Sequence, residues 1–535
     1  MTYRVRHDPA LAAEAYRRGL WVDTTLADAL HTAAEISPAR TVLVDGDVRI
    51  DCATLNADAK RLATALAGRL PRGSVVSFML PNWHEAAVIY LAATLAGMVV
   101  NPILPSLREH DLRFILDDAE ARIIFVPSSF GGHDYSAMLD AVTGPMDPAP
   151  EVVALRGDAG AHTPYPQLLG RQPDPAAFPA LDPDAVRMIL YTSGTTARSK
   201  GVLHSHNSIH ALIRQIHDHW AVEPGDTFLV PSPIAHIGGS IYAFECPLLL
   251  GTAAVLMDRW DPAAAVALMN DERCTHMAGA TPFLQQLLSA AERADTRLPD
   301  LKVFICGGAS VAPSLIRRAA GYFDRAVVTR VYGCTEVPVT TVGAPRPDEA
   351  DRAATTDGRP GIAEVTLAAH DAAPDGDGEI CVRGPQMLLG YRHPEDNAFD
   401  AAGFFRTGDL GRWSDGYLVV TGRAKDVIVR NGENISAKEV EDLLAVHPGI
   451  AEIAVVGLPD ERTGERACAV IVPAADAAPP DVAGLLALLD AKGVAKFKAP
   501  EQVVVWEALP KNDAGKILKH RIRAALIEKG EREHG

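Results

Sequence analysis

The sequence lacks the features that hold small secreted proteins together. Its seven cysteines are scattered through 535 residues, and no two of them form a Cys-x-x-Cys pair. Neither a zinc site of the usual spacing nor a disulfide framework is therefore expected. We expect reduced thiols in a cytoplasmic protein.

A membrane-length apolar run and an excess of positive charge are also missing. The longest apolar run, residues 86–100, falls short of the ~20 residues that a spanning helix needs, so it predicts a buried helix leading into a strand. The chain has 51 Lys and Arg against 68 Asp and Glu, a formal net charge of −17. Such a chain offers no broad surface to nucleic acid or anionic lipid. We expect no nucleic-acid partner and no integral membrane contact, so a bound phosphate must lie in a local pocket.

What is present is the composition of an ordinary globular protein, with 48% hydrophobic and 22% charged residues. Up to about residue 306, short β-rich runs alternate with longer segments whose apolar residues recur at helical spacing. This alternation predicts parallel sheets covered by helices. The expected strands are 74–79, 99–103, 122–126, 186–191 and 253–257, and the expected helices are 83–97, 109–118 and 262–273.

The pattern later changes to shorter, strand-rich units, and the last ~110 residues return to mixed α and β. We therefore expect an α/β fold with a large N-terminal domain, residues 1–424, of parallel sheets covered by helices. It includes a small strand-rich, barrel-like subdomain at about 340–424. A small mobile α+β domain, residues 425–535, would follow a boundary at Lys425.

The most informative segment is residues 191–202, Tyr-Thr-Ser-Gly-Thr-Thr-Ala-Arg-Ser-Lys-Gly-Val. An apolar strand ends in small and hydroxylated residues followed by Lys200. Backbone N–H groups and hydroxyls in such a loop can surround phosphate oxygens, and the lysine supplies positive charge. The Gly-Lys-Ser/Thr of a Walker loop is absent. An ordinary polar turn after a strand is the alternative.

Six further motifs follow in order: Gly-Gly-Ala-Ser at 307–310, Val-Tyr-Gly-Cys-Thr-Glu at 331–336, Gly-Glu-Ile-Cys-Val-Arg-Gly at 378–384, Thr-Gly-Asp at 407–409, Gly-Arg-Ala-Lys-Asp at 422–426 and Pro-Lys-Asn-Asp-Ala-Gly-Lys at 510–516. Together with the loop they resemble the adenylate-forming superfamily of acyl-CoA synthetases, luciferases and peptide-synthetase adenylation domains. The resemblance covers residues 24–525. The sequence as a whole resembles acyl-CoA synthetases of the medium-chain or cyclohexanecarboxylate type.

The resemblance implies an ATP site. Tyr332 would stack on adenine, Asp409 would clamp the ribose, and Arg423 would contact the ribose or the α-phosphate. The implied ATP- and AMP-binding residues are Thr192, Ser193, Gly194, Thr195, Thr196, Lys200, Gly307, Gly308, Ala309, Tyr332, Gly333, Asp409 and Arg423.

The resemblance also implies a two-step reaction. Attack of a carboxylate on the α-phosphorus of ATP gives an acyl adenylate and pyrophosphate, and a thiol then displaces AMP. The implied catalytic residues are Lys516, Thr335, Glu336 and the gate residue His236. Glu336 would hold Mg²⁺, which prefers carboxylate and phosphate oxygen.

The second step implies movement of the C-terminal domain. Lys425 matches the hinge position, and after rotation the loop with Asn431 and Gly432 would form the tunnel for coenzyme A. ATP and coenzyme A would be cosubstrates, and a monomer or a homodimer is compatible with the sequence.

The acid itself is less well defined. Small residues would leave room for the acid, and apolar side chains would line its pocket, which suits a hydrophobic acid. The expected pocket residues are Ile237, Gly238, Gly239, Ser240, Tyr242 and Val337. Between the gate and Glu245 there is no acid to meet an α-ammonium group, which argues against an amino acid. A carrier protein as the acceptor stays open. So does a nucleotide-binding pseudoenzyme, because Ala197 and Ser199 stand where the superfamily commonly has Gly and Pro.

Overall fold

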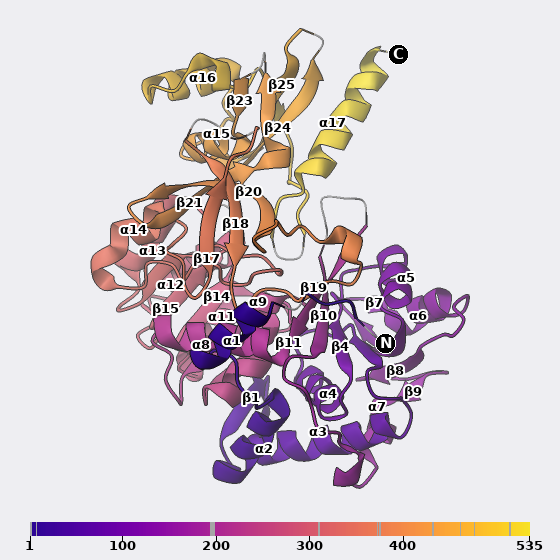
Figure 1. Cartoon of the computed structure of the whole chain (residues 1–535). Helices are drawn as coiled ribbons and strands as arrows, with labels where there is room; N and C mark the ends of the chain where they lie inside the picture. The colour runs from indigo at the N-terminus through magenta and orange to yellow at the C-terminus, as the bar shows by residue number, and fades with distance from the viewer. Residues whose placement is uncertain are drawn as a thin grey trace.

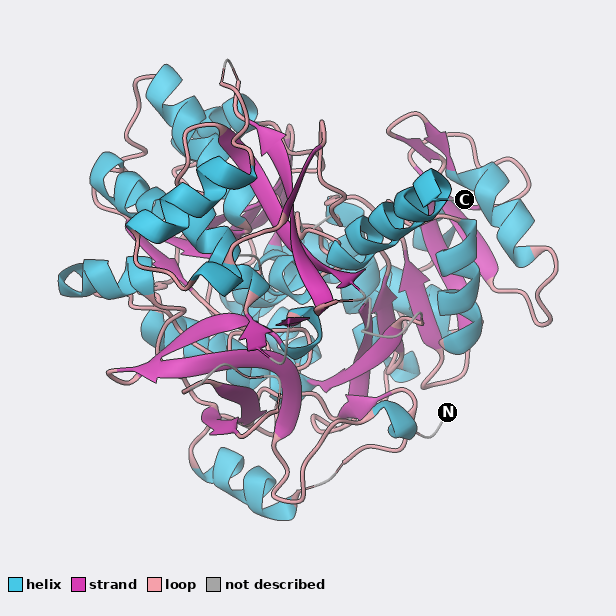
Figure 2. Ribbon diagram, turned by 90° about the horizontal axis from the view of Figure 1, so that it is seen from above, coloured by secondary structure: helices cyan, strands magenta, loops and turns pink. Residues whose placement is uncertain are grey.

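The computed structural model describes residues 3–6, 8–192, 198–308, 311–371, 373, 376–430, 433–460, 462–475, 477–512 and 515–534. Two large sheets and their helices form the lower part of the view in Figure 1, and the C-terminal elements lie above them. The view from above in Figure 2 shows strands gathered between helices. The expected α/β class is confirmed.

One large sheet has seven strands in the order β16-β15-β14-β12-β13-β1-β2. Its pairs are parallel except β1 with β2. The carboxyl ends of β15 and β16 therefore lie at one edge, where ligands of such sheets bind. The strands are β1 (Thr41–Asp45), β2 (Val48–Asp51), β12 (Thr227–Val230), β13 (Ala253–Leu256), β14 (His276–Gly279), β15 (Val303–Cys306) and β16 (Val327–Arg330).

The other large sheet has eight strands in the order β19-β11-β10-β4-β3-β5-β8-β9. β10 runs parallel to β4 but pairs antiparallel with β11, which pairs antiparallel with β19. The loop within residues 191–202, which we expect to bind phosphate and call the phosphate loop, thus connects two neighbouring, hydrogen-bonded strands, β10 and β11. The strands are β3 (Val75–Phe78), β4 (Val99–Pro102), β5 (Ala121–Pro127), β8 (Glu151–Leu155), β9 (Thr163–Pro164), β10 (Val186–Thr192), β11 (Lys200–Ser205) and β19 (Gly390–Tyr391).

Helices bury the faces of both sheets. The long apolar run forms α4 (His84–Leu95), in which every residue from Ala86 to Leu95 is buried, and β4 follows it as expected. Asp261 caps α11 by accepting bonds from the backbone of residues 263 and 264. Other helices are α2 (Leu26–Ile36), α3 (Cys52–Ala67), α5 (Glu109–Asp118), α6 (Tyr135–Thr143), α8 (His206–His219), α9 (Ile237–Ser240), α10 (Cys246–Leu249), α11 (Pro262–Asp271), α12 (Thr281–Arg293) and α13 (Pro313–Tyr322).

The strand-rich part is an antiparallel sheet of β17 (Glu364–Ala368), β18 (Gly378–Arg383), β20 (Phe405–Ser414) and β21 (Tyr417–Arg423), in that order. Within the described residues no pairing joins β17 to β21. The hydrogen-bonded ladder of this sheet is therefore open between β17 and β21.

The C-terminal elements build a separate five-stranded sheet, β23-β22-β25-β24 with β26 beside β25. Its two faces carry separate apolar clusters. α15 and α16 cover one face through Leu444 and Leu485, and α17 covers the other through Ile522. The elements are β22 (Ile428–Arg430), β23 (Glu433–Ile435), α15 (Ala437–Leu444), β24 (Ile450–Asp460), β25 (Gly464–Pro473), α16 (Val482–Ala491), β26 (Gln502–Val505) and α17 (Lys519–His534).

Among the residues described, no helix combines the length and the apolar character needed to cross a bilayer.

Candidate active site

The site is built where β15 and β16 end beneath the strand-rich sheet. Gly307 and Gly308 follow β15. A Cβ on Gly307 would lie 2.9 Å from Val331 Cγ2, so a side chain would not fit there, whereas beside Gly308, with φ of +80°, the space is open. A backbone without side chains on its open flank is what a flat base needs.

Asp409 ties three elements together. It stands opposite Arg423 in the β20–β21 register, and Arg423 Nε lies 2.8 Å from its Oδ1. The Tyr332 hydroxyl, from the loop after β16, donates to Asp409 Oδ2 at 2.9 Å. Burial and the neighbouring Asp409 raise the pKa of Tyr332, so the phenol stays a donor. The structure thus brings together three residues that the sequence assigned to the nucleotide.

Lys516 reaches the same place from the C-terminal loop. Its backbone N–H donates to Asn512 Oδ1 at 2.8 Å, and a Cβ on Gly515 would lie 3.4 Å from Pro282 Cγ at the start of α12. Desolvation at this junction, together with the charge of Arg423, lowers the pKa of Lys516 to about 8, although Asp409 opposes the shift. The loop therefore holds a cation beside the Asp409–Arg423 pair.

The turn with Thr335 and Glu336 is fixed by two residues that the sequence reasoning missed. His204 Nε2 lies 2.8 Å from the carbonyl of Thr335, and Tyr391 donates its hydroxyl to Glu336 Oε1 at 2.7 Å. Burial lowers the pKa of His204 to about 4. It is therefore neutral and donates from Nε2, since the carbonyl can only accept. A polar residue inside an apolar strand, as His204 is in β11, was the available signal.

The phosphate loop is only partly described. Thr192 and Lys200 are opposite each other at the ends of β10 and β11. Lys200 Nζ lies 3.4 Å from Asp396 Oδ1 and 5.2 Å from the ring centroid of Tyr391. Several assigned residues fall outside the described part of the chain: Ser193, Gly194, Thr195, Thr196, Ala309, Asn431 and Gly432.

The gate segment gives mixed support for the acyl pocket. His236 is the N-cap residue of α9, and the space beside Gly238 is open. A Cβ on Gly239 would lie 2.2 Å from the carbonyl oxygen of Pro233, so backbone fills this space. The small size of Gly239 thus serves a close backbone contact, and its place in the acyl pocket stays a prediction.

Of the other assigned pocket residues, Ser240, Tyr242 and Val337 are buried and Ile237 is half-buried. Ser240 Oγ donates to the carbonyl of Ile237 at 3.3 Å. Tyr242 stacks on Phe228 with ring centroids 5.0 Å apart, and Val337 is fully buried. The remaining pocket assignments stay predictions.

Glu245 cannot serve as an acid for an α-ammonium group. Its Oε1 accepts from Tyr90 at 2.6 Å and from Arg187, in a network with almost no solvent exposure. The carboxylate is already paired inside the core. This agrees with the argument against an amino acid substrate.

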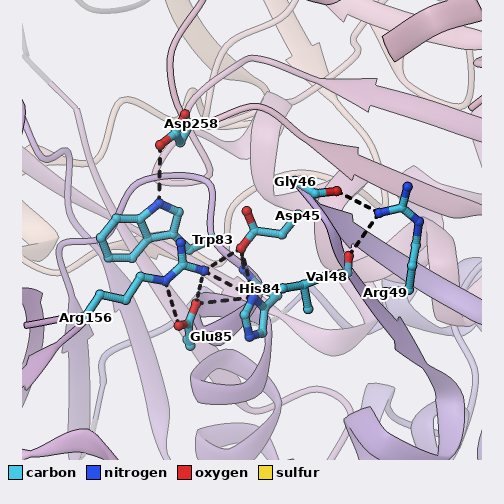
Figure 3. A network of polar contacts seen from close by, with 9 residues as sticks. All are labelled: Asp45, Gly46, Val48, Arg49, Trp83, His84, Glu85, Arg156 and Asp258. Atoms are coloured by element: carbon cyan, nitrogen blue, oxygen red, sulfur yellow. Dashed lines mark hydrogen bonds and ion pairs between the residues drawn. The ribbon is translucent and has the colours of Figure 1, made fainter. Parts of the chain in front are cut away.

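Figure 3 shows another charged cluster, made of Asp45, His84, Glu85 and Arg156. The Asp, His and Glu could offer ligand atoms to a metal, but the Arg156 guanidinium already donates to Asp45 at 2.5 Å and to Glu85 at 2.6 Å. The guanidinium also lies over the ring of Trp83, 4.1 Å from its centroid. The cluster is thus an ion-pair network in which the Arg156 guanidinium occupies the place that a metal ion would take.

Comparisons with known proteins agree with this geometry. The model of the AMP-binding enzyme family matches residues 30–392, and that of the AMP-binding enzyme C-terminal domain matches residues 439–516. The medium-chain fatty-acid–CoA ligase of Escherichia coli is 34% identical over 96% of this chain and 93% of its own. The 2,3-dihydroxybenzoate-AMP ligase of Bacillus subtilis is 30% identical over 97% of both.

Among solved structures, ATP-bound MatB from Rhodopseudomonas palustris superposes with a TM-score of 0.82 at 28% identity, over 94% of this chain and 99% of its own. The matched regions include Tyr332 and Glu336 of the large domain and the loop that ends at Lys516, and Asp409 and Arg423 lie between them. The chain therefore belongs to the AMP-binding enzyme family, the adenylate-forming superfamily.

Proposed function

We propose that the chain is an AMP-forming acid–CoA ligase that activates a hydrophobic carboxylic acid. One observation carries the proposal: Lys516 lies within electrostatic range of Asp409 and Arg423, which form an ion pair in the site that also contains Tyr332. A lysine from the C-terminal part of the chain, close to a carboxylate that would bind the ribose, suits transfer of the AMP group of ATP to an acid. The E. coli relative, named for medium-chain fatty acids, supports an apolar acid.

In the first step the residues would work mainly by position and charge. Arg423 and Asp409 would orient the ribose and the α-phosphate, and Lys516 would bring its ammonium to the acid. Its lowered pKa still leaves Lys516 mostly protonated at neutral pH. The acid oxygen would then attack the α-phosphorus while Lys200 holds the leaving phosphates.

The residues fit a magnesium ion. Glu336 presents a half-buried carboxylate, one oxygen of which is held by Tyr391. One carboxylate plus substrate phosphates is a donor set that Mg²⁺ accepts. When bound, the ion would neutralise charge on the phosphates.

The second step would need a rearrangement of residues 425–535 relative to 1–424, with the hinge at Lys425. Two features support this division. The C-terminal sheet has its own two apolar clusters, and Lys425 lies exposed in a short 3₁₀ turn, Ala424–Asp426, between β21 and β22. A turn residue of this kind can absorb a dihedral change without disturbing a core.

A panel of carboxylic acids tests the proposal. Pyrophosphate release should require an acid, and AMP and acyl-CoA should form in equal amounts only when coenzyme A is added. If coenzyme A has no effect on pyrophosphate release and the enzyme instead transfers the acyl group to a carrier protein, the carrier-loading alternative is favoured. Nucleotide binding without release, for every acid tested, would favour the pseudoenzyme.

A further inference from the structure

Tyr391 lies between the two charged groups that the proposed function assigns to the ATP phosphates and their metal. It ends the short strand β19 and stands opposite Val202 of β11, close to the point where β11 leaves the phosphate loop. Its ring is buried in an apolar cluster that includes Val337 and Phe405. The position is therefore fixed by strand pairing and by packing in this cluster.

The two ends of this side chain do different things. The hydroxyl donates to Glu336 Oε1 at 2.7 Å, and the ring lies 5.2 Å from Lys200 Nζ. Burial, followed by the charge of Glu336, raises the pKa of Tyr391, so the hydroxyl keeps its proton and can only donate to the carboxylate. The face of a phenol ring attracts a cation.

We infer that Tyr391 is a positioning residue that orients Glu336 through its hydroxyl and Lys200 through its ring, for magnesium-bound ATP. The inference rests on the proposed function. The bond from the hydroxyl to one carboxylate oxygen would fix the orientation in which Glu336 meets the metal. The backbone strengthens the link, because Leu388 N donates to the carbonyl of Glu336 at 2.7 Å. The segment 388–391 thus holds the glutamate at two points.

The two roles are separable by substitution. Tyr391→Phe removes the bond to Glu336 and keeps the ring beside Lys200. Tyr391→Leu removes both. A hydrogen bond to a charged group is worth about ten- to a hundredfold in a binding constant, and a partly exposed cation–π contact about three- to fivefold.

The chain contains a matched control. Tyr417, at the start of β21, donates its hydroxyl to Glu349 at 2.8 Å and has Arg352 5.4 Å from its ring centroid. The same tyrosine, glutamate and cation arrangement thus recurs among residues that we assign no part in the site. Tyr417→Phe and Tyr417→Leu remove equivalent contacts.

The experiment is a calorimetric titration of the full-length chain with ATP at a series of Mg²⁺ concentrations, with ATP–pyrophosphate exchange measured alongside. For Tyr391→Phe we expect the Mg²⁺ concentration at half-maximal ATP binding to rise about tenfold, with ATP affinity at saturating Mg²⁺ little changed. Tyr391→Leu should also weaken ATP about three- to fivefold at saturating Mg²⁺. Both Tyr417 variants should follow the unsubstituted chain.

Coincident Mg²⁺ curves for Tyr391→Phe and Tyr417→Phe would overturn the inference, as would identical defects for the two Tyr391 variants. If Tyr391→Leu fails to fold, the Glu336→Gln background decides. There Tyr391→Phe should add no further Mg²⁺ defect, and a full additional defect overturns the inference. Intact ATP binding without exchange for any acid would count against the proposed function alone, whereas no ATP binding at all would overturn both.

Discussion

Two charged clusters in this chain differ in their balance of cations and carboxylates. Around Asp45 two carboxylates share one cation, because Arg156 bridges Asp45 and Glu85 and lies over the ring of Trp83 (Figure 3). At the domain junction, three cationic residues, Arg423, Lys425 and Lys516, lie within electrostatic range of two carboxylates, those of Asp409 and Asp426.

The difference appears in the pKa values. Burial alone would raise the pKa of Asp45, but bonds from His84 and Arg156 lower it to about 2. At the junction, desolvation by neighbouring groups and then the charge of Arg423 lower the pKa of both Lys425 and Lys516. The carboxylates of the first cluster have their cation within the cluster, whereas the second cluster has one cation more than it has carboxylates and can accept an anion from outside. An internal network of ion pairs stabilises the fold, whereas an excess of positive charge is suited to bind phosphate.

The largest expected effect comes from Lys516→Ala. Removing one preorganised charged donor should slow adenylate formation about 10²–10³-fold. Thioester formation from a supplied acyl adenylate should be spared, as measured by separate assays of the two half-reactions. Lys511→Ala is the control, since Lys511 lies in the same loop but pairs with Glu452. Equal losses in both half-reactions would contradict the assignment.

Lys425→Pro should separate the two steps in the opposite direction. Proline fixes φ near −65° and removes a donor, so the turn could not change its conformation. Adenylate should accumulate by mass spectrometry, while transfer to coenzyme A falls roughly tenfold or more, as expected when a gating motion is blocked. Lys425→Ala should keep both steps. A normal rate of thioester formation in a folded proline variant would show that the hinge lies elsewhere.

The pH dependence should reveal the excess of positive charge at the junction. Because the pKa of Lys516 is lowered to about 8, its cation is lost as the pH rises through 8, not above 10. The value of kcat/KM for ATP should therefore fall above pH 8, by up to about tenfold per pH unit. Lys516→Arg, which stays charged, should remove this fall. An unchanged profile up to pH 9.5 in the unsubstituted chain would contradict the lowered pKa.

The network around Asp45 should affect stability and leave ATP binding intact. Arg156→Met leaves Asp45 and Glu85 without their bridging donor and should lower the free energy of unfolding by about 1–2 kcal/mol at pH 7. Because the pKa of Asp45 is lowered when folded, the stabilisation is present above the unfolded pKa near 4. The difference from the variant should shrink as the pH falls through about 2. Urea unfolding of the two proteins at pH 7 and at about pH 2 measures this difference in stability.

Arg317→Met is the control for that comparison. Arg317 forms an ion pair with Asp351 in which both side chains are largely exposed. Such pairs contribute little, so the change should be below about 0.5 kcal/mol. Equal effects of the two substitutions would mean that the network around Asp45 is no stronger than an isolated surface pair.

Local patterns predicted the local structure well. Residues 109–118 form α5 as expected, and residues 253–257 contain β13, because periodicity depends on each segment alone. The order of strands in a sheet, such as β1 beside β13, depends instead on partners far along the chain.

The same limit applies to the site. Motifs identified Asp409 and Lys516, which the fold brings together. They gave no indication of Tyr391, because its role depends on the pairing of β19 with β11 and on a turn more than fifty residues away in sequence. Positioning residues of this kind become visible only in three dimensions.

The central claim is that an acid oxygen attacks the α-phosphorus of ATP before a thiol displaces AMP. An acid labelled with ¹⁸O in both carboxyl oxygens tests this directly, with ATP, Mg²⁺ and coenzyme A present. We predict that each AMP formed with a thioester carries a single ¹⁸O in its phosphate, detected by mass spectrometry. Unlabelled AMP, or label found in inorganic phosphate with ADP as the nucleotide product, would contradict an acyl adenylate and with it the proposed function.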